Sequence, residues 1–237
     1  MKKKIFVRAP CLSQSGYGEQ ARFALRALKS REDLFEIYLQ PIPWGQTGWV
    51  WQDSEFRQWM DSRIIQTQIL LQQQQLQPDM SLQVTIPNEF DRLCPVNIGY
   101  TAGIETDRVA PVWLQKGNEA VDKILVVSNH AKETYTSTKA KAVNRETNEE
   151  VDYKLETPVE VVFENTPRSE PEEIPGFELT QDFNFLVCSQ ISPRKNFENT
   201  IAWWVEEFQN DDVGLIIKTN MKGNSIMALE VTERSLK

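Results

Sequence analysis

Two cations stand together where the sequence passes from a buried strand into a helix. Arg194 and Lys195 lie in the segment CSQISPRKN, residues 188–196, between an apolar run and a helical pattern rich in aromatic residues. A helix N-terminus carries partial positive charge and free N–H groups, so this place favours an anion, above all a phosphate. For a leaving diphosphate, the cations would stabilise charge that grows in the transition state. Two solvent-exposed cations at a helix start explain the residues equally well.

Two glycines follow the first apolar run of the chain. Gly16, Tyr17 and Gly18 lie in the small polar segment CLSQSGYGEQAR, residues 11–22, which we interpret as a loop between a strand and a helix. Glycine lets main-chain N–H groups approach a ligand closely, so this loop could contact a sugar or a phosphate. An ordinary tight turn from strand to helix is the alternative.

An acidic residue comes directly after another predicted strand. Glu105 falls at the carboxyl edge, where open α/β sheets bind ligands, and could bind sugar hydroxyls or stabilise an oxocarbenium-like centre. It could also be an ordinary acid at a helix N-terminus. Glu105 with Asp107 further matches the acidic pair that holds a divalent cation in single-Rossmann glycosyltransferases. His130 follows Ser128 in the first turn of a helix, where we expect a surface or packing role.

Apolar patterning predicts the elements that position these residues. Strands are expected at 5–9, 36–41, 81–86, 97–102, 123–127, 159–163, 184–188 and 213–218, and helices at 21–29, 54–75, 107–120 with a break near 111, 129–136, 197–208 and from about 224. Strands that alternate with helices indicate an α/β fold. We therefore predict a Rossmann-like, doubly wound parallel sheet followed by a partial second Rossmann βαβ unit.

The pattern divides the chain into two domains joined by a linker. Residues 1–166 form the first, with a hairpin insertion at about 138–157, and residues 167–180 are the Pro-rich acidic linker. Residues 181–237 begin the second domain. One βαβ unit with a trailing helix cannot cover both faces of a parallel sheet, so we expect this domain to be incomplete. Three explanations remain open: the unit packs onto the first domain, a second copy or a partner supplies the rest, or the chain is a fragment of a longer protein.

Composition excludes several classes of function. The 237 residues carry a net charge of −8 without a basic stripe, which argues against nucleic-acid binding. Three separated cysteines and a single histidine argue against disulfides and a multi-histidine metal site, and favour the reducing cytoplasm. No apolar run reaches the roughly 18 residues that a transmembrane helix needs.

Taken together, the motifs resemble those of a known enzyme family. The SPRKN junction, the SGYG segment and the stretch from Gly99 to Lys132, with its tyrosine, glutamate, proline, tryptophan and serine in order, are similar to the retaining GT-B glycosyltransferases, including phage-encoded and marine bacterial members. The likeness covers most of residues 1–218. It implies that residues 1–166 are the acceptor-side domain and that residues 181–237 begin the nucleotide-sugar domain.

The resemblance also implies roles for individual residues. Lys195 matches the lysine that holds the donor diphosphate, and Arg194 stands beside it. The family's second cation, an arginine about five residues earlier, falls on Gln190. The family's E-x7-E motif lies well after this lysine, and no pair of glutamates beyond residue 208 has that spacing. Glu105 would be the catalytic acidic residue. The resemblance implies no metal ion and no further cofactor.

The sequence therefore predicts a hexosyltransferase that moves a sugar from a nucleotide-diphosphate sugar to an unknown acceptor, with retention and without metal. The incomplete donor half raises the alternative that this chain alone is inactive. A second hypothesis is a non-catalytic sugar- or phosphate-binding or assembly module. A third is a metal-dependent, single-Rossmann enzyme that uses Glu105 and Asp107.

Overall fold

The chain folds into two units, which are described separately. The computed structural model describes residues 2–143, 150–165, 170–221 and 226–235. The first unit contains residues 1–44 and 49–166, and the second contains 45–48 and 167–237. The division between residues 166 and 167 coincides with the predicted start of the linker, of which residues 166–169 lie outside the described part.

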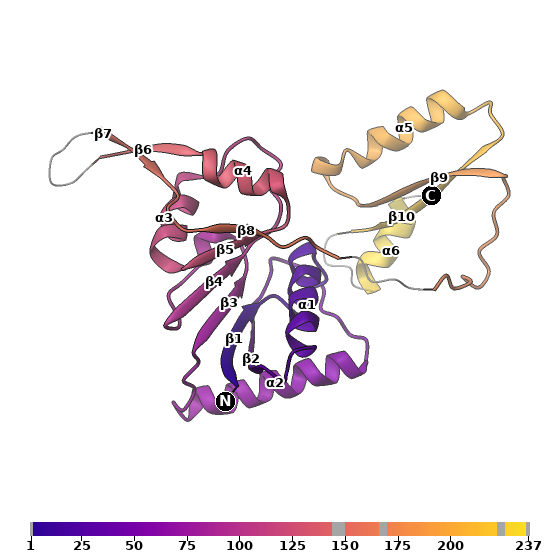
Figure 1. Ribbon diagram of the computed structural model, residues 1–237. Coiled ribbons are helices and arrows are strands. Elements are labelled where there is room, and N and C mark those ends of the chain that lie inside the picture. Colours follow the sequence, from indigo (N-terminus) through magenta and orange to yellow (C-terminus); the bar gives the residue numbers. More distant parts are fainter. Residues whose placement is uncertain (1, 144–149, 166–169, 222–225, 236–237) are drawn as a thin grey trace. The chain divides into compact units, whose positions relative to one another are not determined.

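The first unit is built on a parallel sheet (Figure 1). Its six strands run in the order β2-β1-β3-β4-β5-β8. They are β1 Lys3–Ala9, β2 Phe35–Pro41, β3 Met80–Val84, β4 Val96–Tyr100, β5 Lys123–Val126 and β8 Val159–Val161. Helices flank the sheet, so the predicted α/β class is confirmed and the unit is consistent with a Rossmann-like fold. The order reverses between β1 and β3, the place where ligands commonly bind in open α/β sheets.

Serine caps define most helix starts of the first unit. The helices are α1 Gly16–Lys29, α2 Glu55–Gln72, α3 Pro111–Ala120 and α4 Asn129–Ser137. The hydroxyls of Ser15, Ser54 and Ser128 each accept a main-chain N–H from the first turn of α1, α2 and α4. The cap at Ser15 corrects the sequence prediction, because the helix begins at Gly16 rather than after the polar segment 11–22.

Helix α3 also begins later than predicted. Residues 107–110 are not helical, because Pro111 occupies the first position of the helix and Ala110 before it is extended, with ψ of 141°. A residue that precedes proline is driven out of the helical region by the proline ring. The predicted break near residue 111 is therefore the actual start of the helix.

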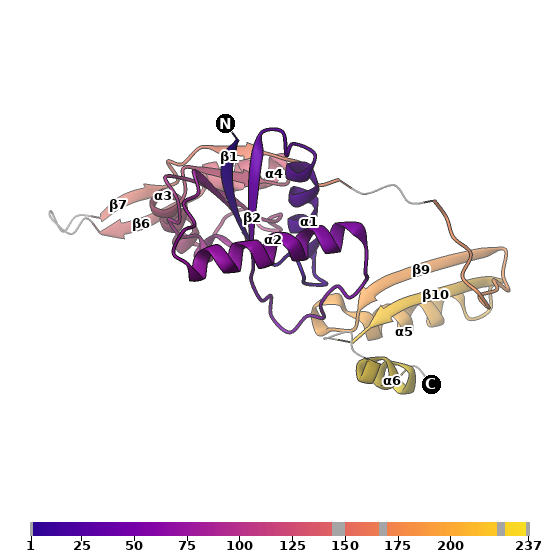
Figure 2. The same cartoon turned by 90° about the horizontal axis from the view of Figure 1, so that it is seen from below.

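Helix α2 packs against β2, the strand at one edge of the sheet (Figure 2). The Thr67 hydroxyl accepts the main-chain N–H of Leu39 at 2.8 Å and donates to the Arg63 carbonyl at 2.7 Å. Thr67 is buried, and so are Met60 and Ile64 on the same helix. The Thr67 hydroxyl thus accepts a main-chain hydrogen bond from β2 that a neighbouring strand would otherwise accept.

The connection between β3 and β4 contains no α-helix. It has eleven residues, 85–95, with one short 3-10 turn, η1 Pro87–Glu89, whereas parallel strands are usually joined through a longer, helical crossover. Ser81 and Gln83 alternate along β3, Thr85 follows directly after it, and all three are fully buried. Alternating polar residues usually face water; here they need polar partners inside the molecule.

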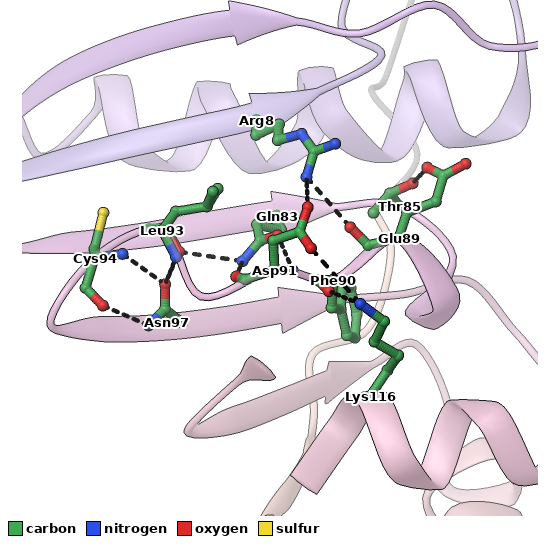
Figure 3. Close-up of polar contacts among 11 residues, drawn as sticks. Arg8, Gln83, Thr85, Glu89, Phe90, Asp91, Leu93, Cys94, Asn97 and Lys116 are labelled. Atoms are coloured by element: carbon green, nitrogen blue, oxygen red, sulfur yellow. Dashed lines mark hydrogen bonds and ion pairs between the residues drawn. The ribbon is translucent and has the colours of Figure 1, made fainter. Parts of the chain in front are cut away.

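The side chains of Asn97 and Glu89 accept hydrogen bonds from the hydroxyls of Ser81 and Thr85. Main-chain groups of the connection bind Gln83 (Figure 3). Gln83 donates from Nε2 to the Asp91 carbonyl at 2.7 Å and accepts the Asp91 N–H at 3.0 Å. The Asn97 carboxamide oxygen accepts the N–H groups of Leu93 and Cys94 at 2.9 and 3.0 Å. Two buried carboxamides therefore hold the connection against the sheet in place of a helix.

Charged residues and one aromatic ring complete this packing. Asp91 pairs with Arg8 at 2.9 Å and with Lys116 of α3 at 3.7 Å (Figure 3). Phe90 is fully buried, and its ring covers Gly99 of β4 so closely that a Cβ atom there would lie 2.4 Å from the ring. Glycine at position 99 is what lets the connection approach the sheet.

The segment predicted to be a hairpin contains two paired strands. Strands β6 Lys139–Val143 and β7 Glu150–Lys154 pair antiparallel and extend away from the sheet in both views (Figures 1 and 2). The polar turn predicted at 144–150 falls mainly on residues 144–149, outside the described part.

The second unit contains one βαβ unit and a further helix. Its elements are β9 Phe183–Gln190, the 3-10 turn η2 Pro193–Lys195, α5 Phe197–Phe208, β10 Val213–Asn220 and α6 Ile226–Ser235. Strands β9 and β10 pair parallel from end to end. Rings of Phe185, Trp204 and Phe208 meet at centroid distances between 4.9 and 6.3 Å. Phe197 is the one fully buried apolar side chain among the described residues of this unit.

Candidate functional site

The glycines of the SGYG segment have different surroundings. Gly18 is buried, its N–H donates to the Ser15 hydroxyl at 3.1 Å, and a Cβ atom on it would lie 2.0 Å from the Ser13 carbonyl oxygen. Gly18 therefore serves the close packing of α1 on the segment before it. Gly16 is exposed, has no atom within 4 Å of an added Cβ, and borders a cavity of about 510 Å³.

Tyr17 joins this helix start to the end of β4. Its hydroxyl lies 3.0 Å from Thr101 Oγ1 and accepts the Ala102 N–H at 3.2 Å. Burial raises the pKa of Tyr17; the hydrogen bonds with Thr101 and Ala102 oppose this effect, and the carboxylates of Glu89 and Glu164 add to it. The Tyr17 phenol therefore stays neutral at physiological pH. Its hydrogen bonds connect the first turn of α1 to the segment after β4, at the carboxyl edge of the sheet.

Further buried polar groups surround Thr101, and the sequence pattern did not reveal them. Gln20 donates from Nε2 to the Thr101 carbonyl at 3.1 Å, while Gln20 Oε1 and the Tyr135 hydroxyl have no partner among the described residues. Both side chains are almost fully buried, and burial raises the pKa of Tyr135. In the sequence, only Gln20, a glutamine on the buried face of α1, could have indicated this group of buried polar residues.

Glu105 lies after β4, at the carboxyl edge of the sheet. Its side chain is exposed, and within the described ranges its carboxylate makes no hydrogen bond or ion pair. The adjoining Thr106 carbonyl lies 3.1 Å from Nε2 of His130, whose side chain is exposed, in agreement with the surface or packing role that we expected. Asp107 pairs with Arg108 at 3.5 Å, and no cluster of three or more acidic, cysteine or histidine residues suited to a metal occurs in the described part.

Arg194 and Lys195 lie at the predicted junction in the second unit. Both side chains are exposed in η2, between β9 and α5. Asn196 then adopts a left-handed conformation with φ of 51° and begins α5 without a side-chain cap. A hollow of about 260 Å³ beside the junction is lined in part by Ser192, Asn196 and Glu198, but not by the two cations. The cations are thus available to an anion in solvent rather than in an enclosed pocket.

The structure brings only some of the predicted residues together. Gly16, Tyr17 and Gly18 form the first turn of α1, next to the end of β4 through the Tyr17–Thr101 contact. Glu105 belongs to the same edge of the sheet, in the segment after β4. Arg194 and Lys195 belong to the other unit.

Comparisons with known proteins gave no match: none with a protein-family model, a curated protein or a solved structure. Among the helices of the described residues, none combines the length and apolar character required to cross a membrane.

Proposed function

We propose that the protein is a glycosyltransferase of the retaining GT-B type, which transfers a sugar from a nucleotide-diphosphate donor without a metal ion. The bond between the sugar C1 and the diphosphate oxygen breaks. A bond from C1 to an acceptor hydroxyl oxygen forms on the same face of the ring. The hydroxyl proton passes to the departing diphosphate, so atoms and charge balance.

One observation carries this proposal: the same strand–loop–helix–strand layout occurs in both units. In the first, β1 ends at Ala9 and α1 begins at Gly16; in the second, β9 ends at Gln190 and α5 begins at Phe197. Each connection has six residues, 10–15 and 191–196, and each returning strand pairs parallel. Two Rossmann-like units, each with a candidate ligand loop after its first strand, fit an enzyme with separate acceptor and donor sides.

The residues take the following roles in this proposal. Lys195 and Arg194 neutralise the donor diphosphate, and their exposure leaves their charges available to it. Gly16 and Tyr17 border the sugar side, with Gly18 holding the helix start in place. Glu105, exposed at the carboxyl edge, stabilises the oxocarbenium-like centre.

A non-catalytic binding module is the second candidate. The observation that favours it is the position of the cations, which lie outside the hollow at the β9–α5 junction, while Glu198 lines that hollow. An acid there opposes a bound diphosphate. In this case the first unit would bind a sugar or a sugar phosphate, and the second would serve assembly.

Calorimetry on the full chain separates these functions. UDP-glucose and GDP-mannose are titrated with and without Mn²⁺ into the wild type, Lys195→Ala, Glu105→Gln and the control Lys154→Ala, which changes an exposed lysine of the hairpin. The proposal predicts metal-independent binding that falls about tenfold in Lys195→Ala and is unchanged in the control, since one charged contact to phosphate is removed.

Two outcomes of these measurements would decide against the proposal, and a third would support it. Binding that requires Mn²⁺ and is lost in Asp107→Asn would identify the metal-dependent enzyme instead. Absence of nucleotide-sugar binding in all conditions would leave the binding module. Release of the free nucleotide diphosphate with an acceptor present, lost in Glu105→Gln although the donor still binds, would support transfer.

A further inference from the structure

A cavity of about 510 Å³ lies between the first turns of α1 and the start of α2. Its walls come from residues 14–26 on one side and 50–60 on the other, all within the first unit. The volume falls in the range of pockets that bind small molecules, about 300–1,000 Å³. The side chains on its walls therefore indicate what it could bind.

Two of the three arginines on the wall are used to build it. Arg22 is buried and donates from Nη1 to the carbonyls of Cys11 and Ser13, both at 2.8 Å, and its Nη2 pairs with Glu19 at 2.5 Å. Arg57 pairs with both oxygens of Asp61, at 2.9 and 3.0 Å. These two positive charges are therefore neutralised by the carboxylates beside them.

The third arginine remains available. Arg26 lies over the Phe56 ring, with its guanidinium carbon 4.6 Å from the ring centre, and its side chain has no hydrogen bond or ion pair in the part of the chain that the structure describes. The aromatic ring supports the guanidinium while its N–H groups stay unused. A planar guanidinium with free donors binds carboxylate or phosphate through two parallel hydrogen bonds. In a chain of net charge −8, this is a local site for an anion.

An exposed tryptophan borders the same cavity. Trp51 is 81% exposed, yet the main chain before it is fixed: the Val50 N–H donates to the Leu12 carbonyl at 2.8 Å, and Arg57 donates to the Val50 carbonyl. The flat apolar face of an indole suits the C–H face of a sugar ring. Gln52 and Ser54 also line the cavity and offer amide and hydroxyl groups to ring hydroxyls.

We propose that this cavity binds an anionic saccharide, with a sugar carboxylate or phosphate on Arg26 and the sugar ring on Trp51. The inference uses residues of the first unit alone and does not depend on the transfer reaction proposed above. The cavity differs from an ordinary surface depression in two ways. Hydrogen bonds and ion pairs hold its walls in place, and one guanidinium on its wall, that of Arg26, is unpaired.

Ligand-observed NMR and calorimetry on the full chain test the proposal. The probes are two anionic sugars, D-glucuronate and D-glucose 6-phosphate. Methyl glucoside is the neutral control. AMP is the second control, because it carries a phosphate on a ribose joined to a base rather than on a hexose ring. We expect both anionic sugars to bind at least about tenfold more tightly than methyl glucoside and AMP.

Matched variants connect the binding to the two residues. Arg26→Gln should reduce anionic-sugar affinity about tenfold, to the level of the neutral sugar, while Arg31→Gln, an exposed arginine outside the cavity, should not. Trp51→Ala should weaken every sugar, whereas Trp203→Ala, an exposed tryptophan of the second unit, should leave affinity unchanged. Thermal melts followed by circular dichroism verify that each variant folds.

Three results would overturn the proposal. They are no binding of either anionic sugar, binding that Arg26→Gln leaves unchanged, and AMP binding as tight as that of the anionic sugars with the same dependence on Trp51. The last would assign the cavity to a nucleotide. None of these results bears on Lys195, so failure here is distinguishable from failure of the transferase proposal.

Discussion

At the scale of single residues, two glycines that look equivalent in the sequence do different work. Gly16 and Gly18 were both predicted to lie in a loop that could contact a ligand, yet both lie in the first turn of α1. The cap by Ser15 could have been recognised from its residue type. The close approach of Gly18 to Ser13 could not, because it depends on how Arg22 draws the carbonyls of the preceding segment inward.

This difference predicts opposite effects of the same substitution. Gly18→Ala should lower the free energy of unfolding by about 2 kcal/mol or more, because the new methyl group would overlap the Ser13 carbonyl. Gly16→Ala is the matched control and should change it by less than about 1 kcal/mol, with a stabilising sign, since alanine favours helix and meets no atom. Urea unfolding measures both free-energy changes. Equal effects of the two substitutions would contradict the close contact between Gly18 and the Ser13 carbonyl.

At the scale of elements, the strands were predicted well and one connection was not. The apolar runs at 5–9, 36–41 and 123–127 correspond closely to β1, β2 and β5, since buried parallel strands are continuous apolar segments. The alternating segment 81–86 was correctly interpreted as a strand. Nothing local to it indicated that its polar face is buried, because the partners of Gln83 are main-chain groups of the connection that follows.

The contact of that connection with β4 can be tested by a double-mutant cycle. Gly99→Ala should lower the free energy of unfolding by about 1–3 kcal/mol, because its Cβ would lie 2.4 Å from the Phe90 ring. In a Phe90→Leu background the same change should cost less than half as much, because the smaller side chain leaves room. Additive effects in urea denaturation would contradict a direct contact.

At the scale of the whole molecule, the two units differ in how much core they possess. Three groups of buried apolar residues support the first unit, whereas Phe197 is the one fully buried apolar side chain described in the second. The composition shift at the Pro-rich segment indicated where the chain divides. The strand order of the first sheet, with β1 between β2 and β3, needed tertiary information that periodicity does not contain.

Unequal cores predict two unfolding transitions. The second unit should unfold at lower urea concentration than the first, because less apolar surface is buried there. Fluorescence should show both steps in the wild type. The variant that carries Trp203→Phe and Trp204→Phe should lose the fluorescence change of the first step while circular dichroism still records it. A single transition, coincident by both probes, would refute this prediction.

The covered edge of the first sheet has a consequence for how the protein behaves when concentrated. On β2, the Leu39 N–H is already taken by the Thr67 hydroxyl, and α2 lies alongside. Strands β9 and β10 form a two-stranded sheet, with no third strand in the described part. Sheets that grow from molecule to molecule need a free row of main-chain donors and acceptors. Aggregation by strand addition should therefore be less favoured at β2 than at β9 or β10, so charged substitutions meant to improve solubility are better placed on those two strands than on β2.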